Sequence, residues 1–176
     1  MILPIILAVL INLNEPLVMF DFTTEASLRY WQVVDDGVMG GRSDGRFGLT
    51  EDGYGIFFGE VSLANNGGFS SVRYAPGTLD VRGRQALVIR LKGDGKKYQL
   101  RLKRRRDDYH SYITTVTTSG EWQEITVPLK EMYPSFRGYR VDLPNFKAEQ
   151  IEEFAILIGN KKAEAFELLI DSIAFQ

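Results

Sequence analysis

Apolar and polar residues alternate along almost the whole chain, and this period of two leaves few folds open to it. Successive side chains of a β-strand point to opposite faces, so alternation is typical of strands buried on one face only. Dipeptides that favour turns, such as Asn66-Gly67, Pro76-Gly77 and Ser119-Gly120, separate the alternating segments. The pattern predicts eleven strands, at residues 17–22, 30–35, 45–50, 55–63, 69–74, 85–91, 97–104, 109–117, 122–127, 154–158 and 166–175.

The strand-rich pattern favours an all-β domain. Only two short segments, near residues 129–132 and at residues 147–153, have a helical pattern. Many short strands in a 176-residue chain predict a two-sheet antiparallel β-sandwich. The order of the last segments, including an aromatic-rich loop after Pro128, resembles a jelly roll of the galactose-binding-like type. We expect residues 17–176 to form a single jelly-roll domain, with Trp31 and Trp122 buried at the starts of their strands.

Residues 1–16 are an apolar N-terminal segment set apart from this domain. A membrane-spanning helix needs about 20 apolar residues, so the segment is too short to cross a bilayer. Its apolar run is similar to that of a secretory signal, but no lysine or arginine precedes it. Two interpretations stay open: a signal-like extension of an exported protein, and an apolar extension that lies against a cytoplasmic domain.

The composition excludes several kinds of chemistry. The chain has no cysteine and a single histidine, His110, which rules out disulfides, thiol catalysis and multi-histidine metal sites. No nucleophile elbow accompanies His110. The net charge of −2 gives no general attraction to nucleic acid. The sequence therefore predicts no catalytic residues, no cofactor and no nucleic-acid partner.

A calcium site is the only metal site worth weighing. Asp21 and Asp171 lie on the first and last predicted strands, which adjoin in a jelly roll. Calcium takes six to eight oxygen ligands, and two carboxylates fall short of that number. We therefore predict no metal site.

Two glycine-rich loops interrupt the strands, at residues 36–41 and 65–69. Glycines at this density indicate positive φ angles or a close approach of the backbone. One interpretation places a binding edge here, lined by Asp36, Met39, Asn65 and Asn66. The other is tight turn geometry, in which Asp36 and Asn66 bond the nearby backbone and Asn66-Gly67 adopts positive angles. Turn geometry is the preferred interpretation.

The strand predicted at residues 97–104 has one apolar face and one cationic face. The cationic face carries Lys97, Gln99, Arg101, Lys103 and Arg105. Arg73 and Arg90, on other predicted strands, join it if their strands pair nearby. Arginine binds carboxylate and phosphate through paired hydrogen bonds, so Arg73, Arg90, Gln99, Arg101 and Lys103 are candidate residues for binding an acidic peptide, a phosphate or a sugar acid. The alternative is a solvated face neutralised by acidic neighbours such as Asp107 and Asp108.

Several motifs resemble one protein family. Trp31, Asp-Gly-Val-Met-Gly-Gly-Arg-Ser at 36–43, Phe-Gly-Glu-Val-Ser-Leu at 58–63 and Asn-Asn-Gly-Gly-Phe-Ser-Ser-Val-Arg at 65–73 are similar to the complex I intermediate-associated protein 30 family. The strand that begins at Trp122 and the strand that contains Ile170-Asp171 fit its C-terminal half. The resemblance implies a galactose-binding-like jelly roll. It also implies a role in protein binding or assembly, because mitochondrial members assist the assembly of respiratory complex I.

The resemblance implies a bacterial-type member more than a mitochondrial one, since no arginine-rich transit segment is present. We expect a non-enzymatic binding domain whose partner is a protein, such as subunits of a membrane or multi-subunit complex. The competing hypothesis is a carbohydrate-binding module whose exposed aromatic residues stack on sugar rings, with Tyr109, Tyr112, Tyr133 and Tyr139 as candidates. Coplanar exposed rings favour sugar, whereas a cationic ladder with apolar rims favours a protein or anionic partner.

Overall fold

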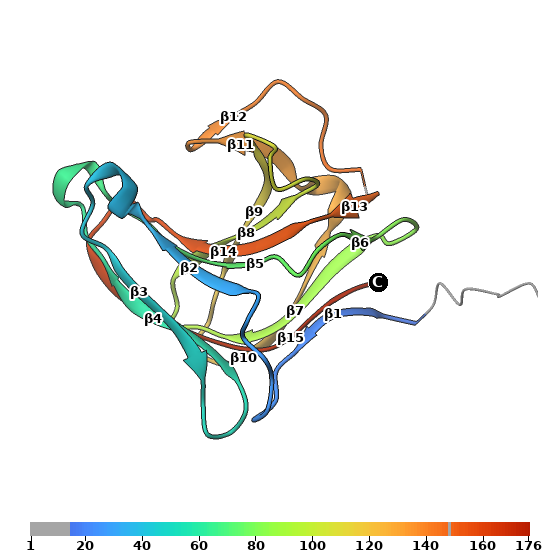
Figure 1. The fold of residues 1–176 in the computed structure, drawn as a ribbon, viewed down its shortest axis with the longest axis horizontal. Coiled ribbons are helices and arrows are strands. Elements are labelled where there is room, and N and C mark those ends of the chain that lie inside the picture. The colour runs from blue at the N-terminus through green and yellow to red at the C-terminus, as the bar shows by residue number, and fades with distance from the viewer. Residues whose placement is uncertain (1–14, 148) are drawn as a thin grey trace, which may run out of the picture.

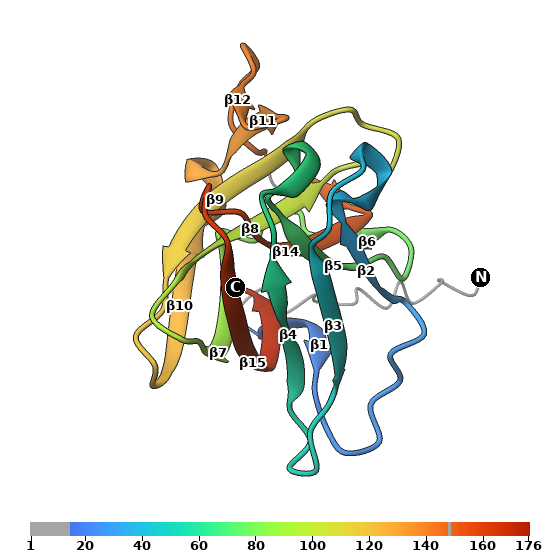
Figure 2. The ribbon, with the colours of Figure 1, turned by 90° about the vertical axis from the view of Figure 1, so that its left-hand side faces the viewer.

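The computed structural model describes residues 15–147 and 149–176, which form a β-sandwich (Figure 1). A six-stranded sheet contains, in order, β10 (Trp122–Pro128), β7 (Ala86–Lys92), β15 (Glu164–Phe175), β4 (Gly55–Val61) and β3 (Asp44–Leu49), and β1 (Leu17–Asp21) also pairs with β15. A seven-stranded sheet contains β12 (Tyr139–Arg140), β11 (Tyr133–Phe136), β9 (Ser111–Thr117), β8 (Lys97–Lys103), β14 (Glu153–Ile158), β5 (Ser70–Tyr74) and β2 (Trp31–Asp35). Figure 2 shows the six-stranded sheet face on, with β10, β7, β15, β4 and β3 side by side.

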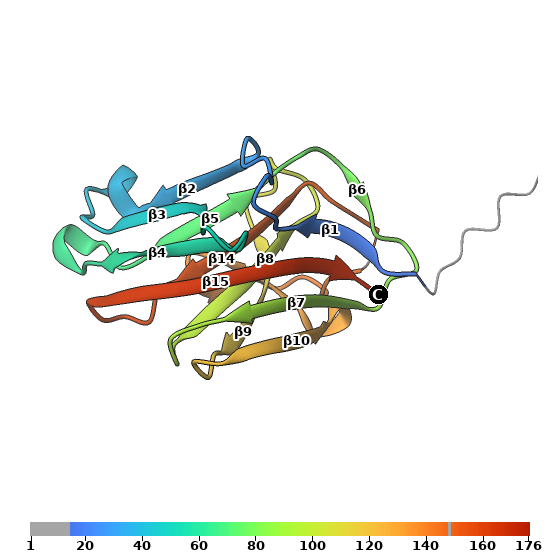
Figure 3. The ribbon, with the colours of Figure 1, turned by 90° about the horizontal axis from the view of Figure 1, so that it is seen from below.

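The smaller elements connect these two layers. β6 (Leu79–Asp80) pairs with β13 (Gln150–Ile151) in a two-stranded sheet. Three 3-10 helices, η1 (Asp36–Met39), η2 (Ala64–Asn66) and η3 (Leu129–Glu131), lie in loops. Seen from below, β1 runs next to β15, where it pairs through Val18 and Phe20 with the end of that strand (Figure 3).

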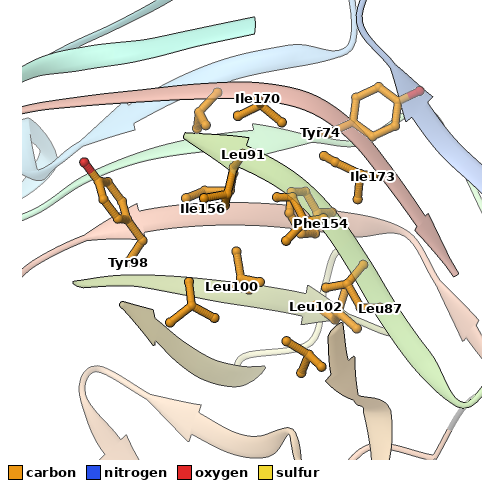
Figure 4. Close-up of a cluster of buried hydrophobic side chains, with 14 of the residues drawn as sticks. Tyr74, Leu87, Leu91, Tyr98, Leu100, Leu102, Phe154, Ile156, Ile170 and Ile173 are labelled. Carbon is orange, nitrogen blue, oxygen red and sulfur yellow. The ribbon is translucent and has the colours of Figure 1, made fainter. Parts of the chain in front are cut away.

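The alternation of the sequence builds the core. On β8, Tyr98, Leu100 and Leu102 are fully buried, whereas the residues between them face away from the six-stranded sheet. Figure 4 shows side chains of both sheets meeting in the interior, among them Leu87, Leu91, Leu100, Leu102, Phe154, Ile156, Ile170 and Ile173. Burying each large apolar side chain stabilises the fold by about 1.5–3 kcal/mol.

The eleven predicted strands are confirmed, each within about two residues at its ends. The short helix near residues 129–132 is confirmed as η3. A helix at residues 147–153 is wrong for the part that the structure describes: Gln150 and Ile151 form β13 and Glu153 begins β14. Ile151 belongs to the core cluster, and its backbone pairs with Leu79, so packing overrides the local helical pattern.

Two other expectations have mixed outcomes. The aromatic-rich loop after Pro128 is a hairpin, β11–β12. Trp31 is buried, but Trp122 is only half-buried and stacks against Tyr54, with ring centroids 4.7 Å apart.

Residues 1–14 of the predicted N-terminal segment lie outside the described residues. Along 15–147 and 149–176, no helix has the length and hydropathy required to cross a bilayer.

Candidate binding cleft on the seven-stranded sheet

A cleft of about 600 Å³ lies on the seven-stranded sheet, on the face opposite the core. Its floor comes from β5, β14, β8 and β9, through Ser71, Arg73, Gln99, Arg101, Lys103, Ser111, Glu153, Ala155 and Leu157. Its walls come from Gly68, Phe69 and Gly159 and from Tyr109, Phe136, Arg137 and Gly138. We call this set of residues the cationic cleft. In Figure 1 the β11–β12 hairpin lies at the top, above the sheet, and the two coils of η1 and η2 lie at the left, beyond the ends of the strands.

Strand register brings the two floor arginines close to each other. Arg73 of β5 lies opposite Ala155 of β14, and Ala155 lies opposite Arg101 of β8. Two guanidinium groups therefore flank one small side chain across three neighbouring strands. Because the side chain of Ala155 is only a methyl group, the floor between the two guanidinium groups is open.

The cleft carries an excess of positive charge. Arg73, Arg101, Lys103 and Arg137 are basic, and Glu153 is the only acidic residue in its lining. The Glu153 carboxylate lies 4.0 Å from Arg73, and the Lys103 ammonium donates to the backbone oxygen of Asp108 at 2.6 Å. Three of the four cations are therefore not neutralised by a carboxylate inside the cleft.

Arg101 occupies the floor without an ion-pair partner among the described residues. Its guanidinium donates to the side-chain oxygen of Gln99 at 3.0 Å. Burial and the nearby Arg73 guanidinium lower the pKa of Arg101, against the opposing effect of Glu153. A guanidinium nevertheless stays protonated at neutral pH, so the floor keeps a partly desolvated positive charge.

One wall of the cationic cleft is aromatic. Tyr109 is 58% exposed and Phe136 is 39% exposed. Their ring centroids lie 5.4 Å apart at an interplanar angle of 82°, so the rings meet edge to face and form no flat platform. The guanidinium carbon of Arg137 lies 5.2 Å from the Phe136 ring. The wall offers apolar contact area next to charge.

The tyrosines predicted to stack on sugar do not gather in this cleft. Tyr109 lines it, whereas Tyr112 is buried in the core cluster. Tyr133 lies beneath the Arg140 guanidinium at 5.1 Å, and Tyr139, although 79% exposed, is not among the lining residues.

Arg90 does not join the cationic ladder, so that prediction is wrong. It lies on β7 in the six-stranded sheet, where it forms a 2.8 Å ion pair with Asp171 and stacks on Trp122. This ion pair also occupies one of the two carboxylates considered for calcium. Among the described residues, no cluster of three or more His, Asp or Glu side chains is placed to hold a metal ion.

Asp36 is buried, and its carboxylate accepts hydrogen bonds from the two glycine-rich loops and the residues that follow them. Its carboxylate accepts hydrogen bonds from the Ser43 hydroxyl at 2.6 Å and the Ser43 N–H at 3.1 Å. It also accepts from the backbone N–H groups of Gly68 at 2.6 Å and Phe69 at 3.2 Å. Burial raises the pKa of Asp36, but these hydrogen bonds outweigh burial and hold the pKa below its ordinary value. Asp36 is thus out of reach of a ligand, and the binding-edge interpretation is wrong for it.

The glycines beside Asp36 are required for space. A Cβ atom on Gly41 would lie 2.1 Å from Oδ1 of Asp36, and one on Gly67 would lie 2.5 Å from Oδ2. Gly67 itself has a φ of −68°, so the expected positive angle at Gly67 is wrong. The positive angles fall on Asn65 and Asn66, at 54° and 62°.

The other loop candidates lie beside the cationic cleft and not in its lining. Asn65 and Asn66 are exposed, and the Asn65 side chain donates to the backbone oxygen of Gly40 at 2.9 Å. The side chain of Met39 lies outside the described part of the structure. The loops contact the cleft through Gly68 and Phe69 alone.

Of the predicted binding residues, Arg73, Gln99, Arg101 and Lys103 come together in the cationic cleft. Phe136, Arg137 and Glu153 also line the cleft, and the sequence did not predict them as site residues. The sequence held a signal for the first two, because Arg137-Gly138 sits between two aromatic residues. In the structure both residues have positive φ, 49° and 83°, as a two-residue hairpin turn requires.

The fold and the family follow from comparison with known proteins. Residues 20–170 match the family described as Complex I intermediate-associated protein 30 (CIA30). No curated protein matches the chain.

Among solved structures, a family 11 carbohydrate-binding module from Clostridium thermocellum in complex with a beta-1,3-1,4-mixed-linked tetrasaccharide has a TM-score of 0.68. This match has 13% identity and covers 91% of this chain and 94% of that chain. The family 11 module of the cellulosomal cellulase Lic26A-Cel5E of Clostridium thermocellum has a TM-score of 0.69 at 12% identity, over 92% and 94% of the two chains. The agarase AgWH50C has a TM-score of 0.62 at 14% identity, over 92% of this chain and 24% of that chain.

At such identities the likeness to solved structures concerns the fold, and it confirms the two-sheet antiparallel jelly roll. The family match extends over nearly all of the described sandwich and includes both glycine-rich loops and the floor of the cationic cleft. The chain therefore belongs to the complex I intermediate-associated protein 30 family.

Proposed function

We propose that this chain is a non-catalytic binding domain whose cationic cleft holds an acidic segment of a partner protein. The observation that carries the proposal is Arg101, a cation in the cleft floor with no ion-pair partner among the described residues and with Arg73 two strands away. A partner carboxylate supplies the missing charge through a charge-assisted hydrogen bond. The aromatic wall of Tyr109 and Phe136 supplies apolar contact area, as interface cores do.

A binding role suits the composition of the cleft better than catalysis does. Ser71 and Ser111 line it, but His110, the only histidine of the chain, is not among the lining residues. The membership of the family supports a role in holding subunits while a larger complex assembles. We infer that such subunits are the partners of this cleft.

Affinity capture from the native host tests this function. The cleft variant is Arg73→Gln/Arg101→Gln, which removes two positive charges from the floor without adding negative ones. The matched control is Lys97→Gln/Lys130→Gln, because both lysines are exposed and lie outside the cleft, and Lys97 is on the same strand as Arg101. We expect wild type and control to capture the same partners, and the cleft variant to bind them at least about tenfold more weakly. Equal capture by a cleft variant with an unchanged melting temperature would overturn the proposal.

Carbohydrate binding is the second candidate, and the exposed ring of Tyr109 favours it, although Tyr109 and Phe136 together form no flat platform. The sandwich it shares with carbohydrate-binding modules gives further support. Titration calorimetry separates the two candidates, with neutral gluco-oligosaccharides and uronic-acid oligosaccharides as probes. Saturable binding that Tyr109→Ala removes and Arg73→Gln/Arg101→Gln retains would favour a neutral sugar. An absence of heat with both probes, together with capture of a protein partner, would favour the first candidate.

A further inference from the structure

The floor of the cationic cleft changes in chemical character along the direction of its strands. The pairing of β14 with β5 and β8 sorts the floor into three rows, which contain Ser71, Leu157 and Gln99; Arg73, Ala155 and Arg101; and Glu153 and Lys103. Successive rows are two residues apart on each strand, or about 7 Å. Phe69 lies beyond the first row, and Tyr109, which precedes β9, lies beyond the third. A cationic middle row is therefore bounded by an aromatic side chain at each end of the floor.

The polar groups around the middle row are hydrogen-bond donors. Arg101 donates to the side-chain oxygen of Gln99, which leaves the N–H groups of that amide without a partner among the described residues. Ser71 is buried, and its hydroxyl donates to the backbone oxygen of Val34 at 2.8 Å. Guanidinium groups have no acceptor atom. A ligand group above the middle row should therefore be a pure acceptor, as a phosphate or a carboxylate is, and not a sugar hydroxyl.

The floor carries more positive charge than a single carboxylate balances. Arg73, Arg101 and Lys103 are basic and Glu153 is acidic, so the floor has a net charge of +2. The Glu153 side chain is only 12% exposed, against 36% for Arg73, so the guanidinium is the more accessible member of their 4.0 Å pair. A phosphoryl group on a serine or threonine carries a charge of about −1.5 to −2 at pH 7. This charge matches the floor more closely than that of one carboxylate.

The two guanidinium groups are placed to share one anion. The α-carbons of Arg73 and Arg101 are two strand spacings apart, or about 10 Å, with the Ala155 methyl group between them. After burial, the Arg73 charge is the next largest cause that lowers the pKa of Arg101, so the two cations interact across Ala155. An anion above Ala155 relieves this repulsion and can accept paired N–H donors from both sides.

Resting on the binding function proposed for the cationic cleft, we infer that the group held above Ala155 is a phosphorylated serine or threonine in an extended segment of the partner protein. Every second side chain of an extended segment points to the same face, at a spacing of about 7 Å that equals the spacing of the rows. Apolar side chains two positions before and after the phosphorylated residue then lie toward Phe69 and Leu157 on one side and toward Tyr109 on the other.

Three synthetic pentapeptides test this inference. Each has the sequence Phe-Ala-X-Ala-Phe with blocked ends, where X is phosphoserine, glutamate or serine, and the repeated Phe makes the result independent of the direction of binding. Titration calorimetry at constant ionic strength measures their affinities, with inorganic phosphate as a fourth probe. We expect the phosphoserine peptide to bind at least about tenfold more tightly than the glutamate peptide, and the serine peptide and inorganic phosphate to bind more weakly still.

Matched variants locate the phosphoryl group. Arg101→Gln should weaken binding of the phosphoserine peptide about tenfold, and Arg73→Gln is a second weakening variant if Arg101→Gln fails to fold. Arg101→Lys should also weaken it, because lysine keeps the charge but lacks the paired donors. Lys97→Gln is the control, since Lys97 is exposed, lies on the same strand as Arg101 and does not line the cleft. We expect the control to bind as the wild type does.

Tight binding of the phosphoserine peptide that Arg101→Gln weakens and Lys97→Gln retains supports the inference. Equal affinity for the glutamate peptide, equal affinity for inorganic phosphate, or no saturable binding of the phosphoserine peptide would overturn it. Phosphatase treatment of the host extract before affinity capture separates this inference from the proposed function. Capture that requires Arg73 and Arg101 but survives phosphatase would leave the acidic partner in place and remove the phosphorylated residue. Capture that Arg73→Gln/Arg101→Gln does not weaken would be a failure of the proposed function itself.

Discussion

At the scale of single residues, Asp36 links two loops that are distant in the sequence. Its carboxylate in the first loop receives hydrogen bonds from the N–H groups of Gly68 and Phe69 in the second loop. Each hydrogen bond to a charged group contributes about 1.5–3 kcal/mol. Residue 36 therefore fixes one end of the sandwich, next to the wall of the cationic cleft formed by Phe69.

The lowered pKa of Asp36 makes this contribution dependent on pH. The group has a folded-state pKa below the ordinary value of 3.8, so its stabilising effect is complete above that value. The effect is lost as the pH falls from there through the pKa of the folded state. Asp36→Asn should lower the free energy of unfolding by about 3 kcal/mol or more at neutral pH, and this difference should narrow as the pH falls below 3.8. Urea unfolding of both proteins across this range is the measurement, and a constant difference between them would contradict the prediction.

Gly41 is required by the same carboxylate, and Gly37 provides a control within the same loop. A Cβ atom on Gly41 would overlap with Asp36, whereas one on Gly37 would meet no atom within 4 Å. Gly41→Ala should cost at least about 2 kcal/mol. Gly37→Ala should be neutral or stabilise by about 0.5 kcal/mol. Thermal unfolding of the two variants measures the difference, and equal melting temperatures would show that the loop can move away from Asp36 at no cost.

At the scale of secondary structure elements, the β11–β12 hairpin positions the aromatic wall of the cationic cleft. Its turn places Phe136 next to Tyr109 and requires positive φ at Arg137 and Gly138. The hairpin lies at the edge of the seven-stranded sheet and pairs only with β9. An edge element of this kind can lose its conformation while the rest of the sheet stays folded.

Gly138 and Gly120 make a matched pair for testing the hairpin. Both are turn glycines with φ near +84° (83° and 85°), and an added Cβ would meet nothing within 4 Å at either position. Alanine at each should cost about 1 kcal/mol through backbone strain alone. We expect Gly138→Ala to weaken capture of the cleft partner and Gly120→Ala to leave it unchanged. Loss of capture by both variants would assign the effect to global stability instead of the hairpin.

The strands were predictable from the sequence because alternation is local information. Each of the eleven predicted segments became a strand, and the apolar face of β8 became core. Which sheet a strand joins depends on distant partners, and this is why Arg90 was assigned to the wrong face. The Asp36 hydrogen bonds span 32 and 33 residues, so no local pattern around position 36 could reveal them.

At the scale of the whole molecule, a single core connects both sheets. Ile173 of β15 and Leu100 of β8 belong to one cluster of buried side chains, which also includes Trp31 of β2. A continuous core predicts that the domain unfolds as one unit. A destabilising substitution in the middle of either sheet should therefore shift the unfolding transition that every spectroscopic probe reports.

Ile173→Ala tests this expectation. The side chain is fully buried, so its truncation should cost about 2–5 kcal/mol. Trp31 belongs to the other sheet, and far-ultraviolet circular dichroism reports on the strands as a whole. We expect tryptophan fluorescence and circular dichroism to shift to the same lower urea midpoint in the variant. Separate midpoints would mean that the two sheets unfold independently, and Trp122→Phe removes the second fluorophore as a control.

The place of β15 in its sheet has a consequence for synthesis in the cell. This strand pairs with β1, β4 and β7, so the centre of the six-stranded sheet is filled by residues 164–175. Until those residues have emerged from the ribosome, β4 and β7 have no partner between them, and their unpaired edges are open to other chains. The domain should consequently fold after translation of this strand and not progressively during it, and nascent chains stalled before residue 164 should stay sensitive to protease.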